Sequence, residues 1–163
     1  MFEQRKYTDI KSTAEDRIVA TGVKGEKVIV FLTSAPKLNK GALETCIAEM
    51  AAAGIPHAII VYKDGVTACT GKTIQQLGTK RIELFAQEDL QYNVTKHRLQ
   101  PEFERLSPKE AETFRKRFNV DHFPTMRFAD PVARFLDYRR NDIIKITTAR
   151  GARLQITFRI VKG

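Results

Sequence analysis

The sequence predicts an α+β protein with an N-terminal α/β domain and a C-terminal domain containing a small mixed sheet and short helices. Two apolar runs rich in β-branched residues, Lys27–Thr33 and His57–Tyr62, flank a segment of helical periodicity, as in a strand-helix-strand unit with parallel strands. Two further apolar segments near the C-terminus predict a pair of strands. The net charge of +9 is uneven, because residues 93–163 carry 16 Lys/Arg against 8 Asp/Glu, while residues 1–92 carry 12 against 11.

This change in charge balance places the domain boundary near residue 92. Residues 1–25 are polar and charged with little periodicity, which predicts an N-terminal arm without settled structure. Residues 26–92 form the predicted α/β domain, and residues 93–163 form the predicted C-terminal domain. At 163 residues, the chain is long enough for one large domain or two small ones.

The helix of the N-terminal domain is predicted from one apolar face, and Gly54 and Pro56 mark its end. That face consists of Leu43, Cys46, Ile47, Met50 and Ala51. Beyond a polar loop, the segments Arg81–Phe85 and Tyr92–Thr95 are candidates for further strands.

In the C-terminal domain, residues 107–119 predict a helix with a capping box. Ser107 is a good N-cap, Pro108 suits the first helical position, and Glu110 occupies the third. The predicted buried stripe consists of Ala111, Phe114 and Phe118. Asn119 is suited to the left-handed position that ends many helices.

A second, very short helix is predicted after a strand at residues 125–129. Asp130 can cap its N-terminus, and Pro131 presets the backbone of the first helical residue. Asp137 and Asn141 lie where the chain turns back. Two strands then follow, within residues 142–148 and 153–161, joined by residues 149–152.

The segment Gly65–Thr73, GVTACTGKT, is the strongest candidate for a catalytic motif, because it follows a strand and contains Gly-Lys-Thr. A Walker A loop needs four residues between the first glycine and Gly-Lys-Thr, and here there are five. No later apolar strand ends in an aspartate that could bind magnesium. A P-loop nucleotide-binding enzyme is therefore an alternative interpretation, and a polar loop is the simpler one.

No cofactor or metal site is predicted. His57, His97 and His122 are far apart in the sequence, and none pairs with a cysteine at ligand spacing. Cys46 is expected in the core, and Cys69 has no neighbouring histidine that would make it a nucleophile. No segment is long and apolar enough to cross a membrane, so no membrane is expected as a partner. No small-molecule ligand is expected as a partner either.

The basic C-terminal part suits nucleic acid or an acidic protein partner. It equally suits a solvated surface that aids solubility. A free-standing basic nucleic-acid-binding module is therefore a second alternative, although the chain has no Trp and few interleaved aromatic residues for stacking on bases.

The segment around Asp130 resembles the C-terminal signature of the fifth common subunit of eukaryotic RNA polymerases, a family that includes an archaeal counterpart. That family reads L-P-R-I, D-P-V-A-R-Y and G-x-K-R-G-x-V-V-K-I, and this chain has FP, DPVARF and DYRRNDIIKI. The segments NVTKHRLQPE and RLQITFRIV resemble flanking family segments. VIVFL and AIIVYKDGVTACT resemble the family's jaw domain.

The resemblance implies a non-catalytic polymerase subunit with an α/β jaw domain. It implies docking on the largest polymerase subunit, contact with other polymerase subunits, and a jaw near downstream duplex DNA that it contacts weakly. The expected subunit-interface residues are Asp130, Pro131, Arg134, Arg139 and Arg140. The expected nucleic-acid-binding residues are Lys63, Thr67, Ala68 and Lys72. The expected location is the nucleus, or a virion or cytoplasmic viral factory for a viral member.

Three departures from the family pattern have physical consequences. Ala68 replaces a usual proline, which predicts a more flexible loop. Asp137 and Asn141 replace two glycines, and they are the residue types that best tolerate positive φ. A short arm stands in place of the family's N-terminal helical segment, which suggests a divergent member, for example from a large DNA virus or a protist.

Overall fold

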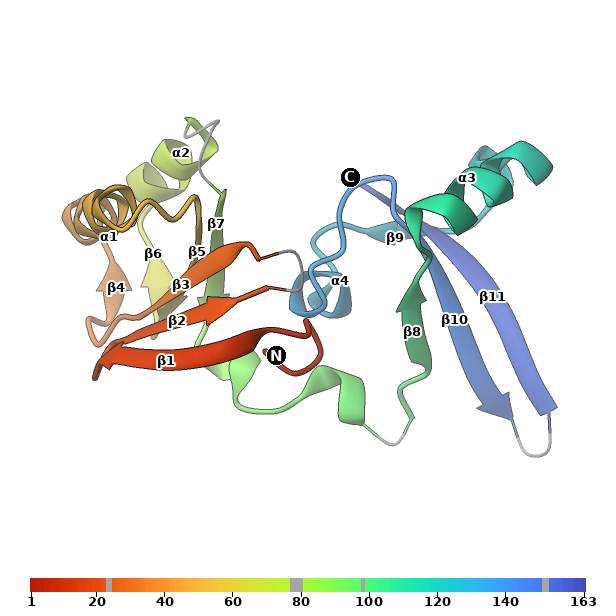
Figure 1. The fold of residues 1–163 in the computed structure, drawn as a ribbon, viewed down its shortest axis with the longest axis horizontal. Helices are drawn as coiled ribbons and strands as arrows, with labels where there is room; N and C mark the ends of the chain where they lie inside the picture. Colours follow the sequence, from red (N-terminus) through yellow and green to blue (C-terminus); the bar gives the residue numbers. More distant parts are fainter. Residues whose placement is uncertain (23–24, 77–80, 98, 151–152) are drawn as a thin grey trace. The chain divides into compact units, whose positions relative to one another are not determined.

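The computed structural model describes residues 1–22, 25–76, 81–97, 99–150 and 153–163 (Figure 1). Apart from Met1, these residues form two compact units, Phe2–Tyr92 and Asn93–Gly163. The division falls where the charge balance of the sequence changes. Both units contain helices and strands, so the predicted α+β class is confirmed.

The N-terminal unit is built on a five-stranded sheet with the order β1-β2-β3-β5-β7. Strands β3, β5 and β7 are parallel, β2 pairs antiparallel with β3, and β1 pairs antiparallel with β2. The strands are β1 (Thr8–Ala14), β2 (Arg17–Thr21), β3 (Lys27–Leu32), β5 (His57–Tyr62) and β7 (Arg81–Ala86). The central strands β3 and β5 are nearly continuous in apolar residues because both of their faces are buried.

Helix α1 (Lys40–Ala52) connects β3 to β5, as the periodicity predicted. Asn39 caps it by accepting a hydrogen bond from the Ala42 N–H. It ends in a Schellman motif, in which Gly54 has φ 65° and the Ile55 N–H donates to the Met50 carbonyl. Leu43, Cys46 and Met50 are buried against the sheet and Ile47 is partly buried. The prediction for Ala51 was wrong, since it is exposed.

The segment predicted as a polar loop is mostly helical. Strand β6 (Gly65–Val66) pairs in parallel with β4 (Lys37–Leu38), and helix α2 (Ala68–Gln76) follows at once beside α1 (Figure 1). Thr70 anchors α2, because its buried hydroxyl donates to the Leu38 carbonyl. A short 3₁₀ turn, η1 (Glu88–Leu90), follows β7.

The N-terminal arm was predicted wrongly, because residues 8–21 form the β1–β2 hairpin at the edge of the sheet. All residues of β1 are exposed, so no apolar alternation marks the strand in the sequence.

The C-terminal unit has a four-stranded sheet with the order β8-β10-β11-β9. Its strands are β8 (Glu102–Arg105), β9 (Thr125–Arg127), β10 (Ile143–Arg150) and β11 (Arg153–Lys162). Only β9 runs parallel to its neighbour, β11. The strand predicted at Tyr92–Thr95 was wrong: Asn93 caps a 3₁₀ turn, η2 (Val94–Lys96). The turn expected at residues 149–152 lies partly outside the described residues.

Helix α3 (Pro108–Arg117) covers one face of this sheet and has the predicted capping box. Ala111 and Phe114 pack against Ile143 and Ile160, whereas Phe118 is half exposed. The prediction for Asn119 was wrong, because its φ is −74° and its side chain instead caps the 3₁₀ turn η3 (Val120–His122).

Helix α4 (Pro131–Phe135) covers the opposite face. Val132 and Ala133 pack with Ile144 and Val161, which point to the other side of the sheet from Ile143 and Ile160. The sheet is therefore buried on both faces at the end where α3 and α4 lie.

Candidate functional site

The candidate contact site is the turn that follows α4, residues 137–142, where the resemblance places Arg139 and Arg140; we call it the arginine turn. Asp137 has φ 59° and Asn141 has φ 68°, so the prediction that they replace glycines at left-handed positions is confirmed. The Asp142 N–H donates to the Arg139 carbonyl and closes a β-turn with Asn141 in its third position.

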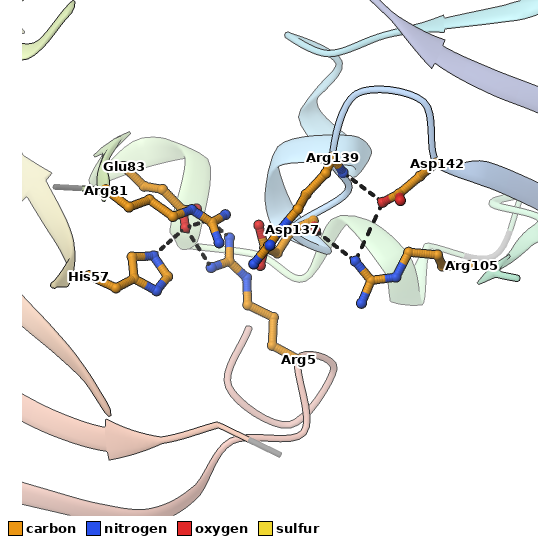
Figure 2. A network of polar contacts seen from close by, with 8 residues as sticks. All are labelled: Arg5, His57, Arg81, Glu83, Arg105, Asp137, Arg139 and Asp142. Carbon is orange, nitrogen blue, oxygen red and sulfur yellow. Dashed lines mark hydrogen bonds and ion pairs between the residues drawn. The ribbon is translucent and has the colours of Figure 1, made fainter. Parts of the chain in front are cut away.

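Polar contacts from Asp142, Arg105 and Arg115 fix this turn, and Figure 2 shows those of Asp142 and Arg105. The Asp142 carboxylate accepts hydrogen bonds from the Arg139 backbone N–H at 2.7 Å and from Arg105 Nη1 at 3.4 Å. Arg105 Nη1 also donates to the Asp137 carbonyl at 3.4 Å, and Arg115 Nη2 donates to the Asn141 carbonyl at 2.7 Å. The backbone that carries the two arginines is thus held in one shape.

Arg139 and Arg140 are both exposed on this rigid turn. The Arg140 guanidinium lies 5.6 Å from the ring centre of Phe128, which is 42% exposed. At this distance the cation is attracted to the face of the aromatic ring, and the two side chains together form a surface that is both charged and apolar. We refer to them as the Arg140–Phe128 pair. The sequence prediction missed Phe128, although an aromatic residue two positions before Asp-Pro is a usable signal.

Asp130 and Pro131 form the start of α4, the helix that precedes the arginine turn. The Asp130 carboxylate accepts a hydrogen bond from the Val132 N–H at 2.9 Å, and Pro131 is the exposed first residue of α4. Arg134 is partly exposed in the last turn of the helix. Tyr138, three residues after the end of α4, is buried, and this burial raises the pKa of its phenol.

The four predicted nucleic-acid-binding residues lie in one segment of the N-terminal unit. Lys63 is exposed between β5 and β6, Ala68 is the exposed first residue of α2, and Lys72 is exposed on α2. Thr67 precedes α2, and its hydroxyl is 2.8 Å from the Thr70 hydroxyl. The expectation of a flexible loop at Ala68 was wrong, because alanine is the best helix former and here it begins a helix.

The loop required by the P-loop alternative is not formed. A phosphate-binding loop presents free backbone N–H groups ahead of its helix. Here Gly71, Lys72 and Thr73 lie inside α2, and the Gly71 N–H donates to the Thr67 carbonyl. The Gly71 N–H is therefore used within the helix and is not available to a phosphate.

A second polar cluster, in the N-terminal unit, was not predicted. Glu83 on β7 accepts from His57 Nε2 at 2.6 Å, from Arg5 Nη2 at 2.7 Å and from Arg81 Nη2 at 3.0 Å (Figure 2). Burial acts to raise the pKa of Glu83, but the hydrogen bond from His57 and the contacts with Arg5 and Arg81 outweigh it, and the pKa falls to about 2. The cluster ties the N-terminal residues to the sheet.

The described residues contain no group of three or more His, Cys, Asp or Glu side chains placed to hold a metal ion. Nor does any helix within the described ranges have the length and apolar character needed to cross a membrane. Burial raises the pKa of Cys46 to about 11, as befits a core thiol, whereas Cys69 is exposed on α2.

Comparison with known proteins identifies the part of the chain that contains the arginine turn. Residues 92–161 match the C-terminal domain of RNA polymerase Rpb5. The resemblance inferred from the sequence is thereby confirmed for this region. The matched range covers the whole sheet of the C-terminal unit except the last residue of β11, together with both of its helices.

Relatives with polymerase names match both units. A protein of Invertebrate iridescent virus 6, whose name describes it as DNA-directed RNA polymerase subunit 454R, is 36% identical over 115 residues, or 64% of this chain and 61% of the viral protein. The subunits RPABC1 of RNA polymerases I, II and III from Caenorhabditis briggsae and Caenorhabditis elegans are each 28% identical over 140 residues, or 83% of this chain. The chain spans 66% of their length.

Proposed function

We propose that this protein is a non-catalytic subunit of a multisubunit DNA-dependent RNA polymerase. The observation that carries the proposal is the match of residues 92–161 to the Rpb5 C-terminal domain, combined with polymerase relatives that align over up to 83% of the chain. The helical Gly-Lys-Thr segment supports an accessory role, because its backbone donors are not available to a phosphate. The nucleus is the proposed location, or a viral factory or virion for a viral member.

The proposed docking face is the arginine turn with α4, and the proposed partner is the largest polymerase subunit. Arg139 and Arg140 are exposed on a backbone that Asp142, Arg105 and Arg115 hold in place. A pre-ordered turn loses little conformational entropy on binding, which favours affinity. Arg134 is the third proposed contact, and Asp130 and Pro131 set the position of α4.

The proposed role of the N-terminal unit is to lie near downstream duplex DNA. Its contact with DNA is weak and local in this proposal, because residues 1–92 carry 12 basic against 11 acidic residues. Exposed Lys63 and Lys72 are the proposed phosphate contacts. Affinity for DNA should fall steeply with salt, since each neutralised phosphate releases counterions. Sequence-specific binding that survives high salt would contradict this role.

Affinity purification tests the proposed function directly. The tagged chain should co-purify with the catalytic subunits of one polymerase, identified by mass spectrometry. Replacing both turn arginines, Arg139→Glu with Arg140→Glu, should weaken association by about 2–5 kcal/mol where they form buried charge pairs and by less at a solvated rim. Recovery of the chain without any polymerase subunit would refute the proposal.

A matched control separates local contact from net charge. Lys27→Glu with Lys37→Glu makes the same charge change at two exposed sites of the N-terminal unit. This variant should bind polymerase like wild type. Equal loss in both double variants would mean that bulk charge, and not the arginine turn, governs association.

A further inference from the structure

The far half of the β10–β11 hairpin lacks the cover found near the helices. Strand β9 pairs with β11 only over Ile160–Lys162. From Arg153 to Arg159, β11 is thus an edge strand within the part of the chain that the structure describes. Figure 1 shows the hairpin continuing well past β9.

The backbone of this edge offers unpaired hydrogen-bonding groups at alternate residues. The Ile160 N–H donates to the Pro124 carbonyl, on the β9 side, and the Val161 N–H donates to the Asp142 carbonyl, on the β10 side. Since successive N–H groups of a strand point to opposite edges, those of Leu154, Ile156 and Phe158 point to the open edge.

The side chains of the same segment differ between the two faces of the strand. Leu154 is 74% exposed and Ile156 is 53% exposed, and both lie on the face that carries Phe158. The other face presents Arg153, Gln155, Thr157 and Arg159, which are all exposed.

The edge has few of the features that normally protect such a strand. Exposed apolar edges promote pairing with other chains, and proteins commonly block them with proline, bulges or inward charges. Here the pairing of β10 with β11 runs without a register shift from Ile143↔Ile160 to Arg150↔Arg153, and no proline interrupts β11. A regular, open edge with one exposed apolar face is well suited to pairing with a partner strand.

We propose that the edge of β11 from Arg153 to Arg159 binds an extended segment of a partner protein in which acidic and apolar residues alternate. The added strand would take up the open backbone groups, as in other cases of strand addition. Its apolar side chains would cover Leu154 and Ile156, and its acidic side chains would face Arg153 and Arg159. The inference rests on the proposed function for the kind of partner, another polymerase subunit.

Charge argues against a second copy of this chain as the occupant. Two copies of β11 paired antiparallel about Ile156 would place Arg153 of each opposite Arg159 of the other, on the same face. Like charges directly opposite one another destabilise a strand pair. An acidic strand removes this repulsion and replaces it with attraction.

The candidate contact site lies on the same edge of the sheet as the open segment of β11, with β9 between the two. The Phe128 N–H donates to the Lys162 carbonyl, so Phe128 extends the pairing of β9 along the same edge of the sheet. Arg140 lies over Phe128. One partner chain could therefore contact the Arg140–Phe128 pair and the open edge of β11 together.

A peptide titration of the full chain tests the inference. The probe is an eight-residue peptide that alternates glutamate and valine, and the comparison peptide alternates lysine and valine. With the acidic probe, amide exchange at Leu154, Ile156 and Phe158 should slow by at least about tenfold, because a bound strand protects these groups. The amides of Gln155 and Thr157 already face β10 and should change less.

Two matched substitutions complete the test. Ile156→Lys should weaken the acidic probe by at least about tenfold through loss of apolar contact. Ile10→Lys changes a comparably exposed isoleucine on β1, an edge strand of the five-stranded sheet, and should leave binding unchanged. The proposal would be overturned if both peptides bound equally well, or if the acidic probe slowed amide exchange equally at successive residues of β11. It would also be overturned if the chain formed concentration-dependent dimers that protected these same amides.

A photo-crosslinking residue at position 156 separates this inference from the proposed function. In chain purified from cells, it should crosslink to another polymerase subunit. If the chain co-purifies with polymerase but this position captures no subunit and the peptide does not bind, the inference fails and the proposed function stands. If the peptide binds and protects the amides of alternate residues, but no polymerase subunit co-purifies, the proposed function fails. The inference that the edge of β11 binds an extended segment is then retained.

Discussion

In the N-terminal unit the Glu83 carboxylate binds a buried guanidinium, that of Arg5, whereas in the C-terminal unit the Asp142 carboxylate binds a guanidinium at the surface. The Arg5 side chain is 2% exposed, and that of Arg105 is 47% exposed. A charge held away from water depends strongly on its partner, while a solvated charge does not. The two units therefore use similar ion pairs for different purposes: the first stabilises a core, and the second fixes the shape of an exposed turn.

Removing the charge of Glu83 should have the largest effect. Glu83→Gln leaves the buried Arg5 and His57 without their carboxylate, which should lower the unfolding free energy of the N-terminal unit by about 3 kcal/mol. Urea unfolding, followed by methyl resonances of Ile59 and Ile144, reports on each unit separately. Asp142→Asn in the C-terminal unit should cost about 1 kcal/mol. Equal costs would remove the contrast between the two units.

The buried Glu83 ion pair should also make the stability of the N-terminal unit depend on pH. The pKa of Glu83 is about 2 in the folded state, below its ordinary value of 4.5. A lowered carboxyl pKa stabilises the folded state above the ordinary pKa, and this stability is lost as the pH falls from 4.5 towards 2. The N-terminal unit of wild type should weaken across that window, and the Glu83→Gln variant should show a flatter profile. A matching slope in the variant would assign the acid sensitivity to other groups.

Positive φ angles allow a second comparison. Gly54 ends α1 at φ 65°, and Asn141 lies in the arginine turn at φ 68°. A Cβ at Gly54 would meet no atom within 4 Å, so Gly54→Ala tests the backbone angle alone and should cost about 1–2 kcal/mol. Asn141→Ala should lower the unfolding free energy by about 1 kcal/mol. The cost is smaller than at Gly54 because wild-type asparagine, unlike glycine, also has a Cβ that is strained at positive φ. Asn141→Gly should be nearly neutral; a large loss there would show that the asparagine side chain matters.

Much of the fold could be predicted wherever a local pattern decides the structure. The runs in β3 and β5 are apolar because both faces are buried, and the capping box at Ser107 is a local exchange of hydrogen bonds with Glu110. Asp137 and Asn141 could be placed at positive φ because the resembling family has glycines at these positions, and aspartate and asparagine tolerate that region better than other residues with a side chain.

Other features depend on contacts between residues far apart in the sequence, which a local sequence pattern does not reveal. Strand β8, EFER, and the exposed strand β1 are strands only because a neighbouring strand pairs with them. Helix α2 was missed because glycine and threonine are poor helix formers, and the contact of Thr70 with Leu38 overrides that preference. The Glu83 cluster joins Arg5 across 78 positions of sequence, which spacing alone does not predict.

Helix caps should give a smaller and more even effect in the two units. Asp130→Ala in α4 and Asn39→Ala in α1 each remove a side-chain acceptor for a helix N–H and should each cost about 1 kcal/mol. Pro131→Gly should cost less, because it acts mainly by loosening the unfolded chain. Thermal unfolding of the three variants checks these values. A far larger loss for Asp130→Ala would show that α4, despite its five residues, controls the whole C-terminal unit.

The smallest expected change is a gain in stability at Ala68. This residue is the exposed first position of α2, where proline is favoured because its N–H has no helical partner and its φ is already suitable. The helix begins with the Gly71 N–H donating to the Thr67 carbonyl, so Ala68→Pro removes no hydrogen bond of that ladder. The variant should raise the unfolding free energy of the N-terminal unit by roughly 0.5 kcal/mol by restricting the unfolded chain. Ala42→Pro, at a position whose N–H donates to Asn39 Oδ1, is the matched control and should destabilise α1. A loss of stability in Ala68→Pro would mean that the backbone before α2 cannot accept the ring, since a proline restricts the residue that precedes it, here Thr67.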